Sequence, residues 1–316
     1  MSLDAFKKEI SDEVSTILDS SFSIGVTRTQ EVPHSSDPAI TFPNLDERTQ
    51  GTKLIETCVL YIDIRRSTEL NLVHKQQTVA KLYSAFVRAM TRCANQFGGH
   101  VRGIIGDRVM VVFDAKDCFT SAVDTAMLMN SVAQYVINRY FTRNEVRCGI
   151  GIDYGRMLAT KTGVRRRGNN QHTYRSLVWL GRPANVASKL TDIANKPRET
   201  FELDRVRVGY NYGHGLVWKT ESPWHFTANL RMQPSGNGAY HIDPHFQTCY
   251  PVTEMVETRS QTPAILMTKA VYDGFRSARP QADILVNKWL RRVDVSVPEY
   301  SGEVYGGDFW FKIFEP

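Results

Sequence analysis

Two aspartates in the sequence stand where their carboxylates could meet on one sheet. Asp63 ends the apolar stretch 59–62, and Asp107 follows Gly106 in a tight turn between two strand-like segments. Two aspartates that share two divalent cations suit phosphoryl transfer, because one ion activates an attacking hydroxyl while the other holds a triphosphate. Each aspartate alone is better explained as a strand cap or a turn residue. Their order and flanking patterns favour the metal site.

The residues that follow Asp63 suit a phosphate group. A helix is expected to open at Thr68, and the backbone N–H groups of residues 64–68 would then lie at a helix N-terminus, where anions bind. We therefore expect Arg66, Ser67 and Thr68 to contact the substrate.

The surrounding pattern predicts the elements that position these residues. Alternating, β-rich segments and longer segments of helical period follow one another from residue 56 onward. The order β-α-β-β-α-β-β-α predicts an α+β fold with helices packed on a mostly antiparallel sheet. The expected strands are 57–64, 100–105, 108–113, 145–154 and 175–180, and the expected helices are 68–97, 116–141 and 183–194.

Other segments do not follow this order of strands and helices. Residues 1–52 combine a short amphipathic pattern with a proline-rich polar stretch, so we predict an N-terminal helix and a linker. Residues 198–262 are rich in Tyr, Trp, His, Gly and Pro, and we interpret them as an insertion in a domain that spans 53–316. Residues 303–314 predict a closing β-hairpin.

The bulk composition is that of an ordinary globular protein, with 42% hydrophobic and 23% charged residues in 316. No apolar run approaches the ~20 residues that a membrane-spanning helix needs, and the N-terminus is charged, so we expect a cytoplasmic protein without a membrane partner. Five scattered cysteines argue against a disulfide framework or a thiolate zinc site. The net charge of +6 does not identify a class of partner, and no nucleic-acid partner is expected.

Four motifs stand in order along the chain: YIDIRRST at 61–68, GGHVRGIIGDRVMVVF at 98–113, VRCGIGIDYG at 146–155 and LGRPANVASKL at 180–190. Each alone is a weak signal. Together they resemble the class III adenylate/guanylate cyclase catalytic domain, over roughly 56–195 and again 263–314. The resemblance implies the ferredoxin-like sandwich of that family, with the aromatic-rich segment as an insertion.

The resemblance also implies a metal centre. Asp63 and Asp107 match the metal-binding aspartates of the family, and the carbonyl of Ile64 matches a further ligand. Two divalent ions, Mg²⁺ or Mn²⁺, are then expected in each site.

Three further residues match family positions that handle the substrate. Arg147 matches an arginine that binds the triphosphate, and Asn185 matches the asparagine that orients the ribose. Lys189 stands where the family has an arginine that stabilises the transition state, one helical turn after Asn185. A lysine supplies the charge without the two-pronged guanidinium geometry. As ordinary surface charges, Arg147 and Lys189 would need no such role.

In the family these roles are divided between two subunits packed head to tail. The resemblance therefore implies a homodimer with two equivalent interface sites. Asp63 and Asp107 would come from one protomer, and Asn185 and Lys189 from its partner.

Two positions depart from the family pattern. Purine cyclases read the base with a lysine and with an acidic or polar residue, at positions occupied here by Gly103 and Val178. Neither side chain can hydrogen-bond, so we predict a pyrimidine substrate, CTP or UTP. The adjacent Arg102 could donate to a pyrimidine, and Trp179 could fill the volume that a purine leaves. Strand alternation leaves a purely structural role open for both.

This pattern is similar to the bacterial pyrimidine cyclases of anti-phage signalling, whose cyclic CMP or cyclic UMP activates a separate effector protein. The resemblance implies a nucleotidyl cyclase that releases pyrophosphate. Two alternatives stay open: an adenylate or guanylate cyclase with rerouted base contacts, and an inactive nucleotide-binding module. The γ-phosphate lysine of the family has no clear equivalent in 303–309, and Arg165–Arg167 is a candidate substitute, or else a solvated dimerisation arm or anion patch.

Overall fold

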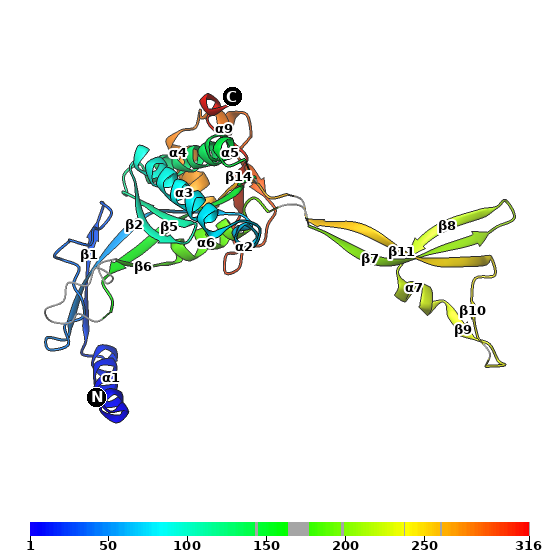
Figure 1. Ribbon diagram of the computed structural model, residues 1–316, viewed down its shortest axis with the longest axis horizontal. Coiled ribbons are helices and arrows are strands. Elements are labelled where there is room, and N and C mark those ends of the chain that lie inside the picture. Colours follow the sequence, from blue (N-terminus) through cyan, green and yellow to red (C-terminus); the bar gives the residue numbers. More distant parts are fainter. Residues whose placement is uncertain (143–144, 164–176, 197–198, 237, 260, 316) are drawn as a thin grey trace. The chain divides into compact units, whose positions relative to one another are not determined.

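The computed structural model describes residues 1–142, 145–163, 177–196, 199–236, 238–259 and 261–315 (Figure 1). The chain divides into two compact units. The first contains Met1–Lys196 and Thr262–Pro316, and the second contains Pro197–Gln261.

A mixed sheet is the centre of the first unit. Its described strands are β1 (Ser23–Thr29), β2 (Thr49–Ile64), β3 (Gly99–Ile105), β4 (Arg108–Phe113), β5 (Cys148–Thr160), β6 (Val178–Leu180), β12 (Ile265–Thr268), β13 (Arg291–Val293) and β14 (Val304–Gly307). Their order is β13-β14-β12-β5-β2-β4-β3, with β1 against β2 and β6 against β5. The β1–β2 and β12–β5 pairs are parallel and the other pairs are antiparallel. The predicted α+β class with a mostly antiparallel sheet is confirmed.

Helices pack on both faces of this sheet (Figure 1). The described helices of the first unit are α1 (Leu3–Leu18), α2 (Ser67–Val73), α3 (Gln76–Gln96), α4 (Cys118–Ser131), α5 (Asn138–Tyr140), α6 (Arg182–Ile193), α8 (Lys269–Ala278) and α9 (Asp283–Val286), with a π-helical turn at Val132–Ile137 between α4 and α5. The main core lies between the sheet and α3, α4 and α8. Helix α6 packs on the opposite face, against β5 and β2.

The alternation of β2 assigns its side chains to these two faces. Leu60 and Ile62 are buried in the main core with α3 and α4. Val59, together with the half-buried Tyr61, packs in the second cluster with alanines of α6. Because successive side chains of a strand point to opposite faces, Asp63 lies on the α6 side.

The N-terminal segment differs from its prediction as helix and linker. Strand β1 pairs with β2, and β2 begins at Thr49, inside the predicted linker. The helix is present as α1, and none of its residues is buried. The proline-rich stretch, residues 30–48, therefore connects two paired strands of the sheet.

The long helix expected over 68–97 is divided into α2 and α3. Helix α2 ends at His74, whose N–H donates to the carbonyl of Leu70, and α3 begins after Lys75. Leu72 and Val73 are exposed at this break, so the apolar period continues in the sequence while the backbone turns.

The closing hairpin predicted for 303–314 is wrong. Strand β14 pairs with β12 and β13 instead of with a following strand. The chain after β14 packs on the π-helical turn and α4: Asn130 donates to the carbonyl of Phe309, and the N–H of Phe311 donates to Ser131. Phe309 is buried in the main core, and burial of that ring draws the segment away from the sheet.

The second unit is a separate antiparallel structure. Its largest sheet has the order β11-β7-β8, and a short hairpin joins β9 to β10. Exposed aromatic side chains, such as Trp218 and Trp224, are frequent on it. The elements are β7 (Glu199–Asn211), β8 (Leu216–Glu221), α7 (Pro223–Ala228), β9 (Leu230–Met232), β10 (Ala239–His241) and β11 (Phe246–Arg259).

Candidate active site

The structure brings Asp63 and Asp107 together. Asp63 lies at the end of β2, opposite Gly149 of β5, and Asp107 lies in the β3–β4 turn after Gly106, which has a φ of 62°. Burial, followed by the negative charge of Asp63, raises the pKa of Asp107 to about 6. Asp63 acts on Asp107 through its charge and also through a side-chain hydrogen bond, so the two carboxyl groups are close neighbours.

The pair suits a divalent cation. Asp107 is 8% exposed, and its Oδ2 has no hydrogen-bond partner among the described residues. A buried, unpartnered carboxylate oxygen next to a second carboxylate is costly without a cation. Mg²⁺ and Mn²⁺ prefer such hard oxygen donors. Ile64, the predicted carbonyl ligand, directly follows Asp63 and ends the same strand.

Arg108 is a site residue that the motifs did not reveal. Its Nη2 donates to Oδ2 of Asp63 at 2.7 Å and also to the carboxylate of Asp192. Its Nη1 donates to the hydroxyl of Ser188 at 2.8 Å. Ser188 and Asp192 belong to α6, so one guanidinium joins the predicted metal ligand to that helix.

Arg65 makes a second connection between the same two regions. Its N–H donates to the carbonyl of Arg147 at 2.7 Å, and its guanidinium donates to the carbonyls of Thr191 and Asp192. These carbonyls end α6, which has no basic residue in its own last turn. The Arg65 cation therefore stabilises the negative end of the helix dipole.

Arg147 contributes its backbone to this region, while its side chain faces solvent. The guanidinium is 46% exposed and pairs with Glu145 at 2.9 Å. The structure thus places Arg147 next to the loop that follows Asp63. Its exposed ion pair with Glu145 is weak enough for the guanidinium to bind a substrate instead.

Asn185 and Lys189 both lie on α6. Asn185 is exposed, and Lys189 pairs with Glu299 at 2.6 Å. Asn185 is seven residues before Asp192, which is about 10 Å along a helix. No contact of either side chain with Asp63 or Asp107 occurs in the described part of the chain.

The predicted phosphate contacts surround the start of α2. Arg66 is the N-cap, with a left-handed φ of 56°, and pairs with Glu69 at 3.8 Å. The Ser67 hydroxyl contacts Asp107 and lowers the pKa of that carboxyl, against the larger effects of burial and Asp63. Thr68 lies in the first turn of α2. Arg165–Arg167 lies outside the described residues.

The predicted base-reading positions have an apolar setting. A side chain at Gly103 would first meet Met110, whose sulfur accepts a hydrogen bond from the Tyr61 hydroxyl at 3.1 Å. Trp179 is half-buried against the cluster that contains Met110, and Val178 is 37% exposed.

The side chain of Arg102, which directly precedes Gly103, contacts the backbone. It lies at an irregular position of the β3–β4 ladder, between Val101 and Gly103. Its Nη1 donates to the carbonyl of Val101 at 3.1 Å. Burial lowers the pKa of its guanidinium, and the nearby Asp114 opposes that effect.

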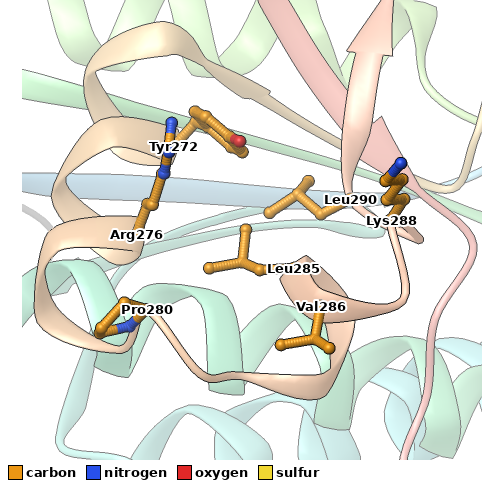
Figure 2. A pocket seen from close by; sticks show the side chains of 7 residues that line it. All are labelled: Tyr272, Arg276, Pro280, Leu285, Val286, Lys288 and Leu290. Atoms are coloured by element: carbon orange, nitrogen blue, oxygen red, sulfur yellow. The ribbon is translucent and has the colours of Figure 1, made fainter.

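A separate cavity of about 350 Å³ lies between α8, α9 and the turn that follows α9 (Figure 2). It contains none of the predicted site residues, so it is not the site described above. Its lining side chains are Tyr272, Arg276, Pro280, Leu285, Val286, Lys288 and Leu290.

Comparison with known proteins identifies the family. Residues 50–202 match the adenylate and guanylate cyclase catalytic domain. A uridylate cyclase of Burkholderia cepacia is 29% identical over 221 residues, 64% of this chain and 91% of that protein. A uridylate cyclase of Xanthomonas perforans is 30% identical over 196 residues, 58% of this chain and 77% of that protein. A cytidylate cyclase of Staphylococcus aureus is 27% identical over 165 residues, 49% and 36% of the two chains.

The chain therefore belongs to the class III nucleotidyl cyclase family, as its motifs indicated. Enzymes of this family generally use divalent metal ions. Among the described residues, no helix is both long enough and apolar enough to span a membrane.

Proposed function

We propose that the protein converts a pyrimidine nucleoside triphosphate into its 3′,5′-cyclic monophosphate and pyrophosphate. The observation that carries this proposal is the close pair Asp63 and Asp107, with a buried carboxylate oxygen that has no hydrogen-bond partner in the described part of the chain. Gly103 and Val178, which cannot hydrogen-bond to a base, support a pyrimidine. The names of the relatives favour UTP before CTP.

The reaction is an internal displacement. The substrate's 3′-oxygen forms a bond to the α-phosphorus, the bond to the β-phosphate oxygen breaks, and the 3′-hydroxyl loses its proton. Asp63 and Asp107, with the Ile64 carbonyl, would hold two divalent cations, Mg²⁺ or Mn²⁺, which polarise the attacking hydroxyl and offset phosphate charge. Arg66, Ser67 and Thr68 would hold the phosphates.

We infer that the site is completed by a second copy of the chain, packed head to tail. Within one chain the C-terminal turn of α6 is occupied by Arg65 and Arg108, while Asn185 is exposed. Asn185 is therefore available to a partner's substrate, where it would orient the ribose. Lys189 would stabilise charge on the phosphorus after leaving Glu299. Arg147 would bind the triphosphate after leaving Glu145.

The test is to incubate the purified protein with each of the four nucleoside triphosphates and Mn²⁺, and to resolve the products chromatographically. Cyclic UMP or cyclic CMP is expected, and Asp63→Ala should abolish it without a change in the circular dichroism spectrum. Cyclic AMP or cyclic GMP would instead support rerouted purine contacts. No product from any triphosphate would support an inactive nucleotide-binding module.

We further propose that the product acts as a cytoplasmic messenger in anti-phage defence, through a separate effector protein that binds it. The similarity to uridylate and cytidylate cyclases supports this proposal. Cyclic pyrimidine nucleotide extracted from cells should rise after phage infection, and Asp63→Ala should suppress the rise. An unchanged level in infected cells would contradict the defence role and leave the enzymatic proposal standing.

A further inference from the structure

One guanidinium connects the metal aspartate to α6 on the same face of the sheet. Arg108 directly follows Asp107, and its side chain is 24% exposed. Its two carboxylate partners differ in setting: the Asp63 side chain is 17% exposed, and that of Asp192 is 53% exposed. Both carboxylates are bound by the same nitrogen, Nη2. Ser188 holds the other terminal nitrogen.

The position of Asp192 requires an explanation. It lies in the last turn of α6, where a negative side chain is unfavourable because of the helix dipole. Its pairing with Arg108 offsets that cost. The arginine thus has two alternative carboxylate partners, one at the predicted metal site and one on the helix.

We propose that Arg108 is a positioning residue for metal binding, a role that rests on the assignment of Asp63 as a metal ligand. Arg108 orients and neutralises the Asp63 carboxylate while no divalent cation is bound. When a cation takes that carboxylate, Arg108 gives up Oδ2 of Asp63 and keeps its contacts with Asp192 and Ser188.

Electrostatics favours this exchange over sharing. A guanidinium and a divalent cation on the same carboxylate oxygen would repel each other strongly within ~4 Å. Asp192 offers Arg108 a full countercharge without a change of rotamer, because the contact already exists. The helix end therefore lowers the cost of releasing Asp63 to the metal.

The experiment measures Mn²⁺ binding by the electron paramagnetic resonance signal of the free ion, without nucleotide. Arg108→Gln removes the competing cation and should tighten Mn²⁺ binding by about tenfold, the effect of roughly one half-buried ion pair. Asp192→Asn should weaken binding by a similar factor, because Arg108 then has only Asp63. In the double variant the Asp192 substitution should have no effect, since no arginine remains to be withdrawn.

A general effect of charge predicts a different result. If Asp192 acted only as a distant negative charge, its replacement would weaken Mn²⁺ binding equally with Arg108 and with Gln at that position, and such additivity would overturn the proposal. Glu69→Gln is the matched control, because Glu69 is an exposed acid on α2 that pairs with Arg66 and not with Arg108. Its effect should be smaller than that of Asp192→Asn and the same in both backgrounds.

Three further outcomes are decisive. Asp192 is exposed, so Asp192→Asn should fold even if Arg108→Gln does not. If Asp192→Asn loses no more Mn²⁺ affinity than Glu69→Gln does, the proposed role of Arg108 is overturned. A wild-type protein that binds no Mn²⁺ would instead overturn the metal site itself. An unchanged affinity in a folded Arg108→Gln, with Mn²⁺ bound by the wild type, would refute only the positioning role.

Discussion

In the metal-free protein, the free energy of unfolding should change as Asp107 titrates, at a higher pH than for an ordinary aspartate. Burial and the charge of Asp63 raise the pKa of Asp107 from an ordinary 3.8 to about 6. Because the pKa is higher in the folded chain than in the unfolded chain, the folded chain binds this proton more tightly. The stabilisation is therefore complete below about pH 4 and is lost as the pH rises through about 6.

Asp107→Asn isolates this effect. The interval between 3.8 and about 6 corresponds to about 3 kcal/mol of unfolding free energy once the carboxyl is ionised in both states. An asparagine is uncharged at every pH and can donate to Asp63. We expect the variant to be more stable than the wild type by up to ~3 kcal/mol above about pH 7, and the difference to disappear near pH 4.

The assay is urea unfolding followed by circular dichroism in EDTA, at pH values from about 4 to 8. Asp46→Asn, at an exposed turn residue, is the control and should give no difference that grows with pH. Added Mn²⁺ should raise the melting temperature of the wild type and not that of Asp107→Asn, because only the wild type keeps both carboxylates. A stability difference between wild type and Asp107→Asn that is constant across this range would refute the reasoning.

Three other changes have defined outcomes. Mixing equal amounts of Asp63→Ala and Asn185→Ala chains should recover about one quarter of wild-type activity. Half of the dimers would then contain one chain of each kind, and each such dimer would hold one intact site. No recovery in a verified heterodimer would contradict shared sites. Thr268→Val removes the hydroxyl that donates to the buried Asp153 at 2.6 Å, and should lower the unfolding free energy by about 1–3 kcal/mol in urea titrations. Gly103→Lys should leave the melting temperature nearly unchanged, because the nearest atom to a new Cβ is 3.5 Å away. The same variant should form more cyclic purine nucleotide in product analysis. A pure pyrimidine product would argue against position 103 as a base contact.

Most of the sheet could be predicted from the sequence because its strands carry strong local signals. The Gly106–Asp107 turn defines β3 and β4 closely, and the alternation before Asp63 defines the end of β2, which begins at Thr49 and not at residue 57. The break between α2 and α3 could not be predicted, because no glycine or proline marks it. The end of the chain was misread for a similar reason: the burial of Phe309 among residues distant in sequence outweighs a local β pattern.

The candidate site was predictable only where it coincides with motifs. Asp63 and Asp107 follow strand and turn signals, and these signals also indicate which end of the sheet they occupy. The contact of Arg108 with Asp192 joins residues 84 positions apart, and nothing in the local pattern of either residue requires the other. Such a pair becomes visible only when α6 is placed on the sheet.

The register of β2 explains why the two aspartates lie on the same face of the sheet as α6. Leu60 and Ile62 commit the even-numbered side chains of β2 to the main core, so Asp63 must project toward α6. The same alternation in β4 buries Val109 in the main core and directs Arg108 to the α6 face. A slip of one residue in β2 would bury Asp63 among apolar side chains, at a cost far larger than any ion pair could offset. The apolar residues on one face of the sheet therefore determine where the charged residues of the other face meet.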